Sequence, residues 1–387
     1  MTKRNAPAAK RQSAAPKGSG ALTMEAAPPP RMPAEWEKHE ATWIAWPHHE
    51  PDWPGKLAPI PWVYAEIVRA LSGHERVEIL CHDEHVVENA RTLLRAHAVP
   101  DSTYRLHVVA NDRVWLRDSA PTAVVRDGQV ELVNWGFNGW AKYPNYKNDA
   151  EIGREIERIT GLPRTVPRRP DNGERVVLEG GGIEVNGAGQ ILVTEEWLLS
   201  DVQVRNPGMK AADYEAVFRE YLGAPTTIWL GEGAVGDDTH GHIDDIARFS
   251  SGDTVILAYE QDPADENHAR SADNMRRLKA LAKKQPLRIV TIPFPRPVMM
   301  NGERLPASYA NFYIANGVVL VPTFNDPNDR VALNGIAEAF PGRTVIGIHA
   351  VDLVWGLGTL HCLTQQQPAG TPNRERRQKP RERGRSR

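Results

Sequence analysis

Between residues 34 and 368 the sequence alternates short apolar, β-branched runs with amphipathic helical stretches. Strands are indicated at 76–80, 104–110, 122–126, 129–135, 190–194, 254–259, 287–293, 317–322 and 344–348. Helices are indicated at 61–73, 83–97, 149–161, 265–284 and 327–340. No linker rich in Pro, Ser or Gly interrupts this alternation. The pattern therefore predicts an α/β fold in one compact domain.

A divergent repeat is indicated by two similar connections from a helix into a strand, "LSGHERVEIL" and "AFPGRTVIGI". The predicted elements also recur in the order strand, strand, helix, strand, with a period of roughly 60 to 70 residues. Ordinary doubly wound folds show a similar rhythm, so the repeat alone does not select one architecture.

Charge is distributed unevenly along the chain. Residues 1–33 carry a net charge of +5 and residues 369–387 a net charge of +6, which leaves about −13 on residues 34–368 when His is counted as neutral. A negative field favours cationic small molecules and disfavours nucleic acid. We therefore expect a small cationic partner and no nucleic-acid partner.

The two ends differ in composition from the body. Residues 1–31 and 369–387 are rich in Lys, Arg, Pro and small residues, and we expect both to be disordered basic tails around a folded domain at 32–368. The first tail also resembles an organelle transit peptide in lacking acids before Glu25, and Met24 and Met32 leave the start codon open.

Cysteine content and hydropathy indicate the compartment. Cys81 and Cys362 are the two cysteines, and neither lies in a C-x-x-C motif. No apolar stretch approaches the roughly 18–20 residues that cross a bilayer. We expect a cytoplasmic protein with no membrane partner.

Cys362 lies in "WGLGTLHCLTQQQP", where glycines allow tight turns beside His361. A cysteine in this position is often a small buried apolar residue. As a nucleophile it has to be held as a thiolate by nearby positive charge, which a cationic substrate can supply.

The segment "GDDTHGHIDDIARF" at 236–249 concentrates acids and histidines. It is compatible with an Asp-rich turn that caps the following element. A second interpretation takes His240, His242 and Asp244 as metal ligands of an amidohydrolase, since alternate residues of an extended segment face the same side.

Two further carboxylates follow apolar runs. Asp118 lies in "WLRDSAPT" and Glu179 in "VLEGGGIEVNG", and each is also compatible with a turn cap. The glycine run 180–182 lacks the spacing of a phosphate loop and indicates instead a position where a backbone can approach closely.

Together a thiol, a histidine and several acids fit a guanidinium better than an ester or a peptide. A guanidinium is planar, cationic and has only donors, so two carboxylates can bind its edges while a thiolate approaches its carbon. A scaffold protein has no use for this combination.

These motifs, with "MPAEWEKHEATWIAWPHHEPDWPGK" before them, resemble the agmatine deiminases and the related bacterial peptidylarginine deiminases, in order from Met32 to Pro368. The resemblance implies a five-bladed α/β propeller (pentein) of ββαβ repeats. It also implies hydrolytic deimination of agmatine to N-carbamoylputrescine and ammonia in putrescine biosynthesis, through a covalent thiouronium on the cysteine, with no metal or other cofactor.

The resemblance also implies the site residues. Cys362 is the expected nucleophile and His242 the general acid/base, with Asp118 and Asp244 as guanidinium clamps and Glu179 as the acid that pairs with the histidine and the substrate.

The resemblance also suggests two further substrate-binding residues, and the sequence differs from the family pattern at two positions. Trp115 is expected beside the substrate chain and Asp238 near its distal amine. His240 and Leu357 depart from residues common in the family, which leaves peptidyl-arginine, free arginine or another guanidine as alternative substrates, and amidino transfer as an alternative reaction. A homo-oligomer, regulation and any role of the tails also stay open.

Overall fold

The chain was analysed as a computed structural model that describes residues 1–2 and 28–370. The predictions of disorder at 3–27 and 371–387 lie outside the described residues. The described part is a mixed α/β structure, as the alternating sequence pattern predicts.

The strands are short, and their bounds are as follows. They are β1 (His39–Ala45), β2 (Arg76–Cys81), β3 (Tyr104–Val108), β4 (Thr122–Arg126), β5 (Gln129–Val133), β6 (Arg164–Thr165), β7 (Glu184–Val185), β8 (Gln190–Thr194), β9 (Thr226–Leu230), β10 (Ala247–Ser251), β11 (Thr254–Ala258), β12 (Arg288–Ile292), β13 (Met299–Met300), β14 (Glu303–Arg304), β15 (Tyr313–Ala315), β16 (Val318–Thr323), β17 (Thr344–His349) and β18 (Gln365–Pro368).

The helices fall into longer ones that cover the sheets and short ones near the centre. They are α1 (Ile60–Leu71), α2 (Glu84–Ala96), α3 (Leu116–Ser119), α4 (Ile152–Thr160), α5 (Glu195–Leu199), α6 (Ala211–Val217), α7 (Glu266–Ala282), α8 (Asn328–Ala339) and α9 (Leu360–Leu363). Two 3-10 turns also matter for the site, η4 (Gly180–Gly182) and η6 (Ile243–Asp245).

One topology recurs in the sheets of the described residues. Two strands pair antiparallel, and the second of them runs parallel to a third that follows a helical connection. The sheets with this pattern are β4-β5-β6, β7-β8-β9, β10-β11-β12, β15-β16-β17 and β18-β1-β2-β3, and a separate pair is β13-β14. The last large sheet joins the two ends of the domain, because β18 lies antiparallel to β1.

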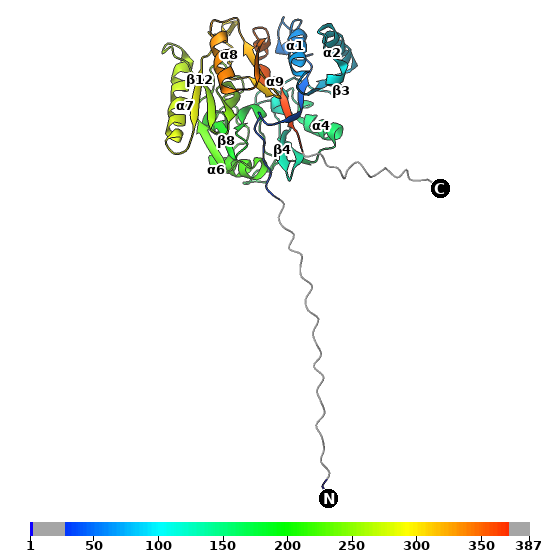
Figure 1. Ribbon diagram of the computed structural model, residues 1–387, viewed down its shortest axis with the longest axis vertical. Coiled ribbons are helices and arrows are strands. Elements are labelled where there is room, and N and C mark those ends of the chain that lie inside the picture. Colours follow the sequence, from blue (N-terminus) through cyan, green and yellow to red (C-terminus); the bar gives the residue numbers. More distant parts are fainter. Residues whose placement is uncertain (3–27, 371–387) are drawn as a thin grey trace, which may run out of the picture.

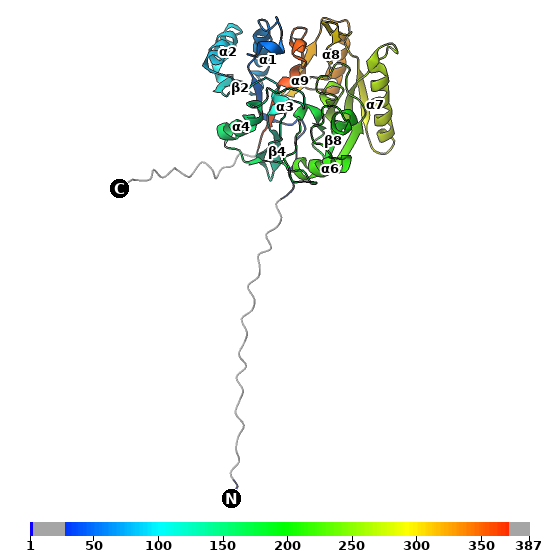
Figure 2. The same cartoon turned by 180° about the vertical axis from the view of Figure 1, so that it is seen from behind.

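The longer helices are amphipathic and lie at the periphery, where Figures 1 and 2 show α1, α2, α7 and α8. Helix α1 buries Tyr64, Ile67 and Leu71 on one face, as its apolar spacing requires. Helix α2 begins after Asp83, whose side chain accepts a hydrogen bond from the Val86 amide at 2.9 Å. These helices shield the apolar strands from water.

The short elements lie at the centre of the molecule. Figure 2 shows α3 and α9 there, and the two helices contact each other. Turn η4 contacts both α3 and η6. Four segments that are far apart in the sequence therefore meet at one point.

The glutamines after the nucleophile candidate hold β18 in place. Gln367 accepts a hydrogen bond from Trp43 Nε1 at 3.0 Å, and Gln366 accepts one from Arg117 Nη1 at 2.6 Å. Gln365 donates to the Pro121 carbonyl at 3.0 Å. These amides fix the chain immediately after α9.

The predicted strand segments all contain observed strands, and the predicted helices match α1, α2, α4, α7 and α8 within a few residues. The main differences are elements that sequence analysis did not predict, which are β1, β6, β7, β9, β10, β13, β14, β15, β18, α3, α5, α6 and α9. Most of these are too short to show a period. Among the described residues, no helix has the length and apolar character to cross a membrane.

Gly182 in η4 supports a testable prediction about packing near the centre. A Cβ on Gly182 would overlap the Trp197 ring, whereas one on Gly73 would meet nothing within 4 Å. We expect Gly182→Ala to lower the free energy of unfolding by roughly 1–3 kcal/mol, because a buried indole cannot move aside. Gly73→Ala should leave it unchanged or raise it by up to about 1 kcal/mol. Urea unfolding of both variants checks this, and equal stability of the two would contradict it.

Candidate active site

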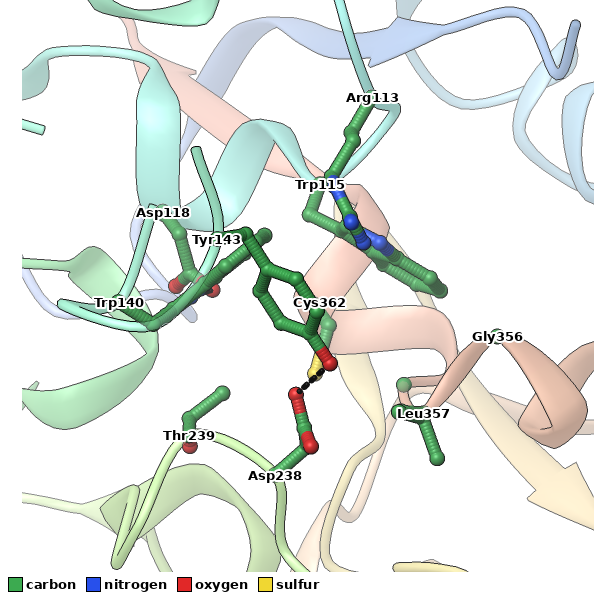
Figure 3. Close-up of a pocket in the computed structure, with 11 residues that line it drawn as sticks. Arg113, Trp115, Asp118, Trp140, Tyr143, Asp238, Thr239, Gly356, Leu357 and Cys362 are labelled. Atoms are coloured by element: carbon green, nitrogen blue, oxygen red, sulfur yellow. Dashed lines mark hydrogen bonds between the residues drawn. The ribbon is translucent and has the colours of Figure 1, made fainter. Parts of the chain in front are cut away.

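A pocket of about 340 Å³, including its open mouth, lies over α3 and α9 (Figure 3). Its lining comes from the segment before α3, from the loop after β5, from the loop before η6 and from the turn before α9. The lining residues are Arg113, Trp115, Asp118, Trp140, Tyr143, Asp238, Thr239, Gly356, Leu357, Gly358 and Cys362.

Cys362 lies on the one-turn helix α9 and is buried. Its sulfur lies 3.1 Å from Asn311 Nδ2 and 3.7 Å from Asp244 Oδ2. Burial and the carboxylates of Asp244 and Asp245 raise the pKa of the Cys362 thiol well above its usual range. Without added positive charge, the sulfur is therefore a neutral thiol.

Asn311 is a site residue that sequence analysis missed. Its Oδ1 accepts from Thr359 Oγ1 at 2.7 Å and from the His361 amide at 3.0 Å, and its Nδ2 also donates to Asp245 Oδ1 at 3.0 Å. One amide thus fixes the start of α9 and the sulfur together. The sequence around it, "YANFY", carries no motif that would have identified it.

Asp118 lies in α3 and its carboxylate is held from two sides. Trp140 Nε1 donates to Oδ2 at 2.8 Å and the Gly181 amide donates to Oδ1 at 3.0 Å. Burial raises the pKa of Asp118 to about 6, with Asp244 and Glu179 adding to the effect and His242 opposing it. The carboxylate is ionised at neutral pH, but a small fall in pH would protonate it because its pKa of about 6 is close to neutral pH.

His242 lies between two carboxylates. Its Nδ1 is 3.9 Å from Asp118 Oδ1 and its Nε2 is 3.5 Å from Glu179 Oε2. Burial lowers the pKa of His242, but the charges of Asp118 and Glu179 outweigh burial and raise it to about 9. At neutral pH the ring is therefore protonated and has a proton to give, and both ring nitrogens are buried without a hydrogen-bond partner in the protein.

Glu179 is the most strongly held acid of the group. It accepts from Arg205 Nε at 3.1 Å and from Trp197 Nε1 at 2.8 Å, with both ends of the Arg205 ion pair fully buried. Burial raises the pKa of Glu179, but Arg205 and His242 outweigh it and hold it at about 2. Sequence analysis missed Arg205, because "VQVRNPG" reads as an ordinary loop.

Asp244 lies in η6 and has one occupied and one unoccupied oxygen. His361 Nδ1 lies 2.7 Å from Oδ2, whereas Oδ1 is buried without a partner. Burial raises the pKa of Asp244, but the hydrogen bond and charge of His361 outweigh it and lower that pKa below its usual value. A buried ionised oxygen without a donor indicates a ligand donor in that position.

The glycine run of η4 allows these groups to meet. A Cβ on Gly181 would lie 2.6 Å from His242 Nδ1, 2.9 Å from Asp118 Oδ1 and 3.1 Å from Asp244 Oδ2. Only a residue without a side chain fits there, as the sequence analysis expected of the glycine run.

Trp115 forms a wall of the pocket. Its ring packs on Trp53 and lies so close to Gly356 and Gly358 that a Cβ at either position would come within 3 Å of it. Leu357 between them has a φ of +69°, a conformation that favours glycine. Leu357, which replaces a residue common in the family, therefore has a left-handed backbone conformation and places its side chain at the edge of the pocket.

Asp238 lines the pocket, but its carboxylate is already paired. Lys142 Nζ lies 2.5 Å from Oδ1, and Tyr143 donates to Oδ2 at 2.7 Å, as Figure 3 shows for the tyrosine. Sequence analysis placed Asp238 near a distal amine and gave no role to Lys142.

His240 and His242, the two histidines of the metal-site interpretation, do not face a common point. His240 Nε2 lies 3.0 Å from Ser200 Oγ, while the His242 ring faces Asp118 and Glu179. The two rings thus have different partners, and the geometry does not favour His240 and His242 as a pair of ligands.

The seven residues predicted for the site occupy one region. Trp115, Asp118, Asp238 and Cys362 line the pocket, and His242, Glu179 and Asp244 are buried in contact with them. This arrangement offers two ionised oxygens, a proton donor and a thiol to a planar cation.

Comparisons with known proteins show the family to which the chain belongs. The model of the Porphyromonas-type peptidyl-arginine deiminase family matches residues 31–368. The agmatine deiminase of Pseudomonas aeruginosa (strain LESB58) is 34% identical over 365 residues, which are 88% of this chain and 95% of that protein.

Solved structures are similar over the same region. Agmatine deiminase of Enterococcus faecalis has a TM-score of 0.80 and 28% identity, covering 89% of this chain and 98% of that chain. A substrate-bound cysteine-to-serine variant of the agmatine deiminase of C. jejuni has a TM-score of 0.80 and 25% identity, covering 91% of this chain and all of the other. The chain therefore belongs to the Porphyromonas-type peptidyl-arginine deiminase family.

Proposed function

We propose that this enzyme hydrolyses a guanidinium substrate in the pocket over Cys362, and that the substrate is agmatine. The observation that carries the proposal is the arrangement of one thiol, one protonated histidine and the carboxylates of Asp118 and Asp244 around a single point. The names of its sequence and structural relatives support agmatine as the substrate. Hydrolytic deimination of agmatine would give N-carbamoylputrescine and ammonia.

The first half of the proposed reaction forms a covalent adduct. Asp118 and Asp244 bind the N–H edges of the guanidinium, the Cys362 thiol loses its proton to solvent, and the resulting thiolate adds to the guanidinium carbon. His242 then gives a proton to one nitrogen, the C–N bond breaks, and ammonia leaves. An S-alkylthiouronium on Cys362 remains.

The second half restores the enzyme. His242, now neutral and next to Glu179, takes a proton from water, and the resulting hydroxide adds to the thiouronium carbon. The C–S bond breaks, the added hydroxyl loses its proton to solvent, and the carbamoyl product departs. The sulfur leaves as thiolate and regains its proton from solvent. The scheme balances without a metal or an organic cofactor.

The substrate's charge is part of nucleophile activation. The thiol lies among carboxylates that raise its pKa, so a bound cation is needed to bring that pKa down. The guanidinium brings this charge to the position where the thiolate reacts. An acidic body, at about −13 over residues 34–368, favours the approach of a cation.

We further propose residues 32–368 as the catalytic unit, between tails 1–31 and 369–387, with the recurring sheets arranged as a five-bladed propeller around Cys362. The matching strand order of these sheets supports that arrangement. The two free thiols, Cys81 and Cys362, are compatible with a cytoplasmic place in putrescine biosynthesis.

A second candidate substrate has an observation in its favour. Lys142 is paired with Asp238, the residue expected to meet the distal amine of agmatine, and a second ammonium there would be repelled. Another guanidine without a distal amine, such as a peptidyl-arginine, would avoid this repulsion.

Substrate identity is tested by ammonia release from agmatine, free arginine and a blocked arginyl peptide. We expect the largest kcat/KM for agmatine, and complete loss with Cys362→Ala. A Cys81→Ala variant is the matched control and should retain activity, because Cys81 lies away from the pocket in β2. Turnover by Cys362→Ala would contradict the proposal, and faster release from the peptide would establish the second candidate.

The clamps and the histidine should differ in kinetic signature. Asp118→Asn or Asp244→Asn removes one charge from a buried ion pair, which typically costs about 3–5 kcal/mol, or roughly two to four decades in kcat/KM. His242→Asn should still bind substrate but should either fail to release ammonia efficiently or stall at the covalent adduct on Cys362, which intact-protein mass spectrometry would detect. If His240→Asn is inactive and His242→Asn is not, these roles have been assigned to the wrong histidine.

The pH profile follows from two shifted groups. Asp118 is ionised only above its pKa of about 6, so its grip on the guanidinium weakens as pH falls through 6. His242 is protonated only below its pKa of about 9, so proton donation weakens as pH rises through 9. We expect kcat/KM to be bell-shaped with limbs near these values. A profile that is flat between pH 5 and pH 7 would contradict the role of Asp118.

A further inference from the structure

His361, next to the nucleophile candidate, has a contact pattern that the proposed mechanism does not use. Its ring is buried, with Nδ1 2.7 Å from Asp244 Oδ2 and Nε2 2.8 Å from Glu35 Oε2. Each ring nitrogen therefore faces a carboxylate, one from the site and one from the segment before β1.

Both carboxylates are ionised. Burial raises the pKa of Glu35, but Arg248 and His361 outweigh it and hold that pKa well below its usual value. The pKa of Asp244 is also lowered, against the effect of burial, by His361. An ionised carboxylate can only accept a hydrogen bond, so each ring nitrogen of His361 faces an acceptor, and a ring that donates to both of them is a cation.

The groups around the ring are charged on every side. They are Asp244 of η6, Glu184 of β7, Arg248 of β10, Arg117 of α3, and Glu35, and His242 is close enough to Asp244 to influence its pKa. Arg248 Nη2 donates to Glu35 at 3.0 Å and Arg248 Nε donates to Glu184 at 2.8 Å. Arg117 Nη2 lies 3.5 Å from Glu35.

This cluster contains a group that could be taken for a metal site. Ligand atoms of Glu35, Glu184 and His361 lie within 4.8 Å of one another. The Arg248 guanidinium, however, bridges the two glutamates, so the chain supplies the balancing cation itself. The same geometry leaves His361 to balance Asp244.

His361 contacts only one of the two carboxylate oxygens of Asp244. His361 holds Oδ2, whereas Oδ1 is buried without any partner. Because Oδ2 is fixed, the carboxylate cannot rotate to exchange its oxygens without losing a charged hydrogen bond. Oδ1 is thereby kept ionised and in one position.

We propose that His361 is a positioning residue, which, anchored by Glu35, holds Asp244 with Oδ1 presented to the guanidinium. The proposal rests on the guanidine chemistry proposed above. It predicts that a change at His361 or Glu35, neither of which lines the pocket, weakens recognition of a planar cation.

The test compares two electrophiles that label Cys362, 2-chloroacetamidine and 2-chloroacetamide. In both, the sulfur displaces chloride and the thiol proton is lost to solvent, but only the amidine carries the planar cation that Asp244 would bind. The ratio of their labelling rates, read by mass spectrometry, reports the charge of the clamp. It requires no knowledge of the natural substrate.

We expect His361→Asn to lower the amidine-to-amide ratio at least tenfold, and Glu35→Gln to lower it at least threefold. In turnover, His361→Asn should raise KM and move the acid limb of kcat/KM to higher pH, because Asp244 has lost its cation. The matched control is His107→Asn, which removes another histidine–carboxylate contact, His107 Nε2 to Glu78 Oε2 at 2.6 Å, at β3 and β2. The control should leave the ratio and the profile unchanged.

Three outcomes separate the possibilities. The proposal would be overturned if a folded His361→Asn or Glu35→Gln variant kept the wild-type amidine-to-amide labelling ratio and pH profile. If His361→Asn does not fold, Glu35→Gln decides the question. Lower thermal stability with an unchanged ratio would show a role in packing only and would also overturn it. A wild-type enzyme with no preference for the amidine would instead contradict the guanidine chemistry, and this inference would fail with it.

Discussion

The structure depends on the burial of several carboxylates beside one thiol. Like charges out of water repel one another strongly, and each must find a cation or a proton. Glu179 is paired with Arg205, Glu35 with Arg248, and Asp244 with His361. Asp118 has neutral donors and a histidine, and its pKa is raised. The site is therefore short of positive charge at the point where a guanidinium would bind.

That shortage connects recognition with reactivity. A thiol surrounded by carboxylates is held protonated, which also protects it from unselective chemistry. In the proposed reaction, a cation that enters the pocket neutralises Asp118 and the free oxygen of Asp244 and at the same time makes the thiolate accessible. Binding and activation then become one electrostatic event, which selects for a planar cation.

The packing that allows this cluster is set by small residues at the centre. Turn η4 brings Gly181 against His242 and both clamps, and Gly182 against Trp197, which in turn donates to Glu179. The sheets and the longer helices contribute to this packing by positioning the short segments. Recurring sheets covered by peripheral helices hold the short segments α3, η4, η6 and α9 at a common centre.

The sequence by itself determined the α/β class, the longer helices and the amphipathic strands, because local periodicity depends only on neighbouring residues. It also predicted Cys362, His242, Glu179, Asp118 and Asp244 as site residues, because each lies in a distinctive motif, and the structure brings these five residues together. Only the tertiary structure decided which groups balance those charges. Arg205 and Asn311 lie in unremarkable segments, and Glu35 lies in a motif that does not reveal its partner, His361. All three act across long stretches of chain, and Asp238 was found paired with Lys142. Charge pairing in a buried site depends on distances in space, which no local pattern records.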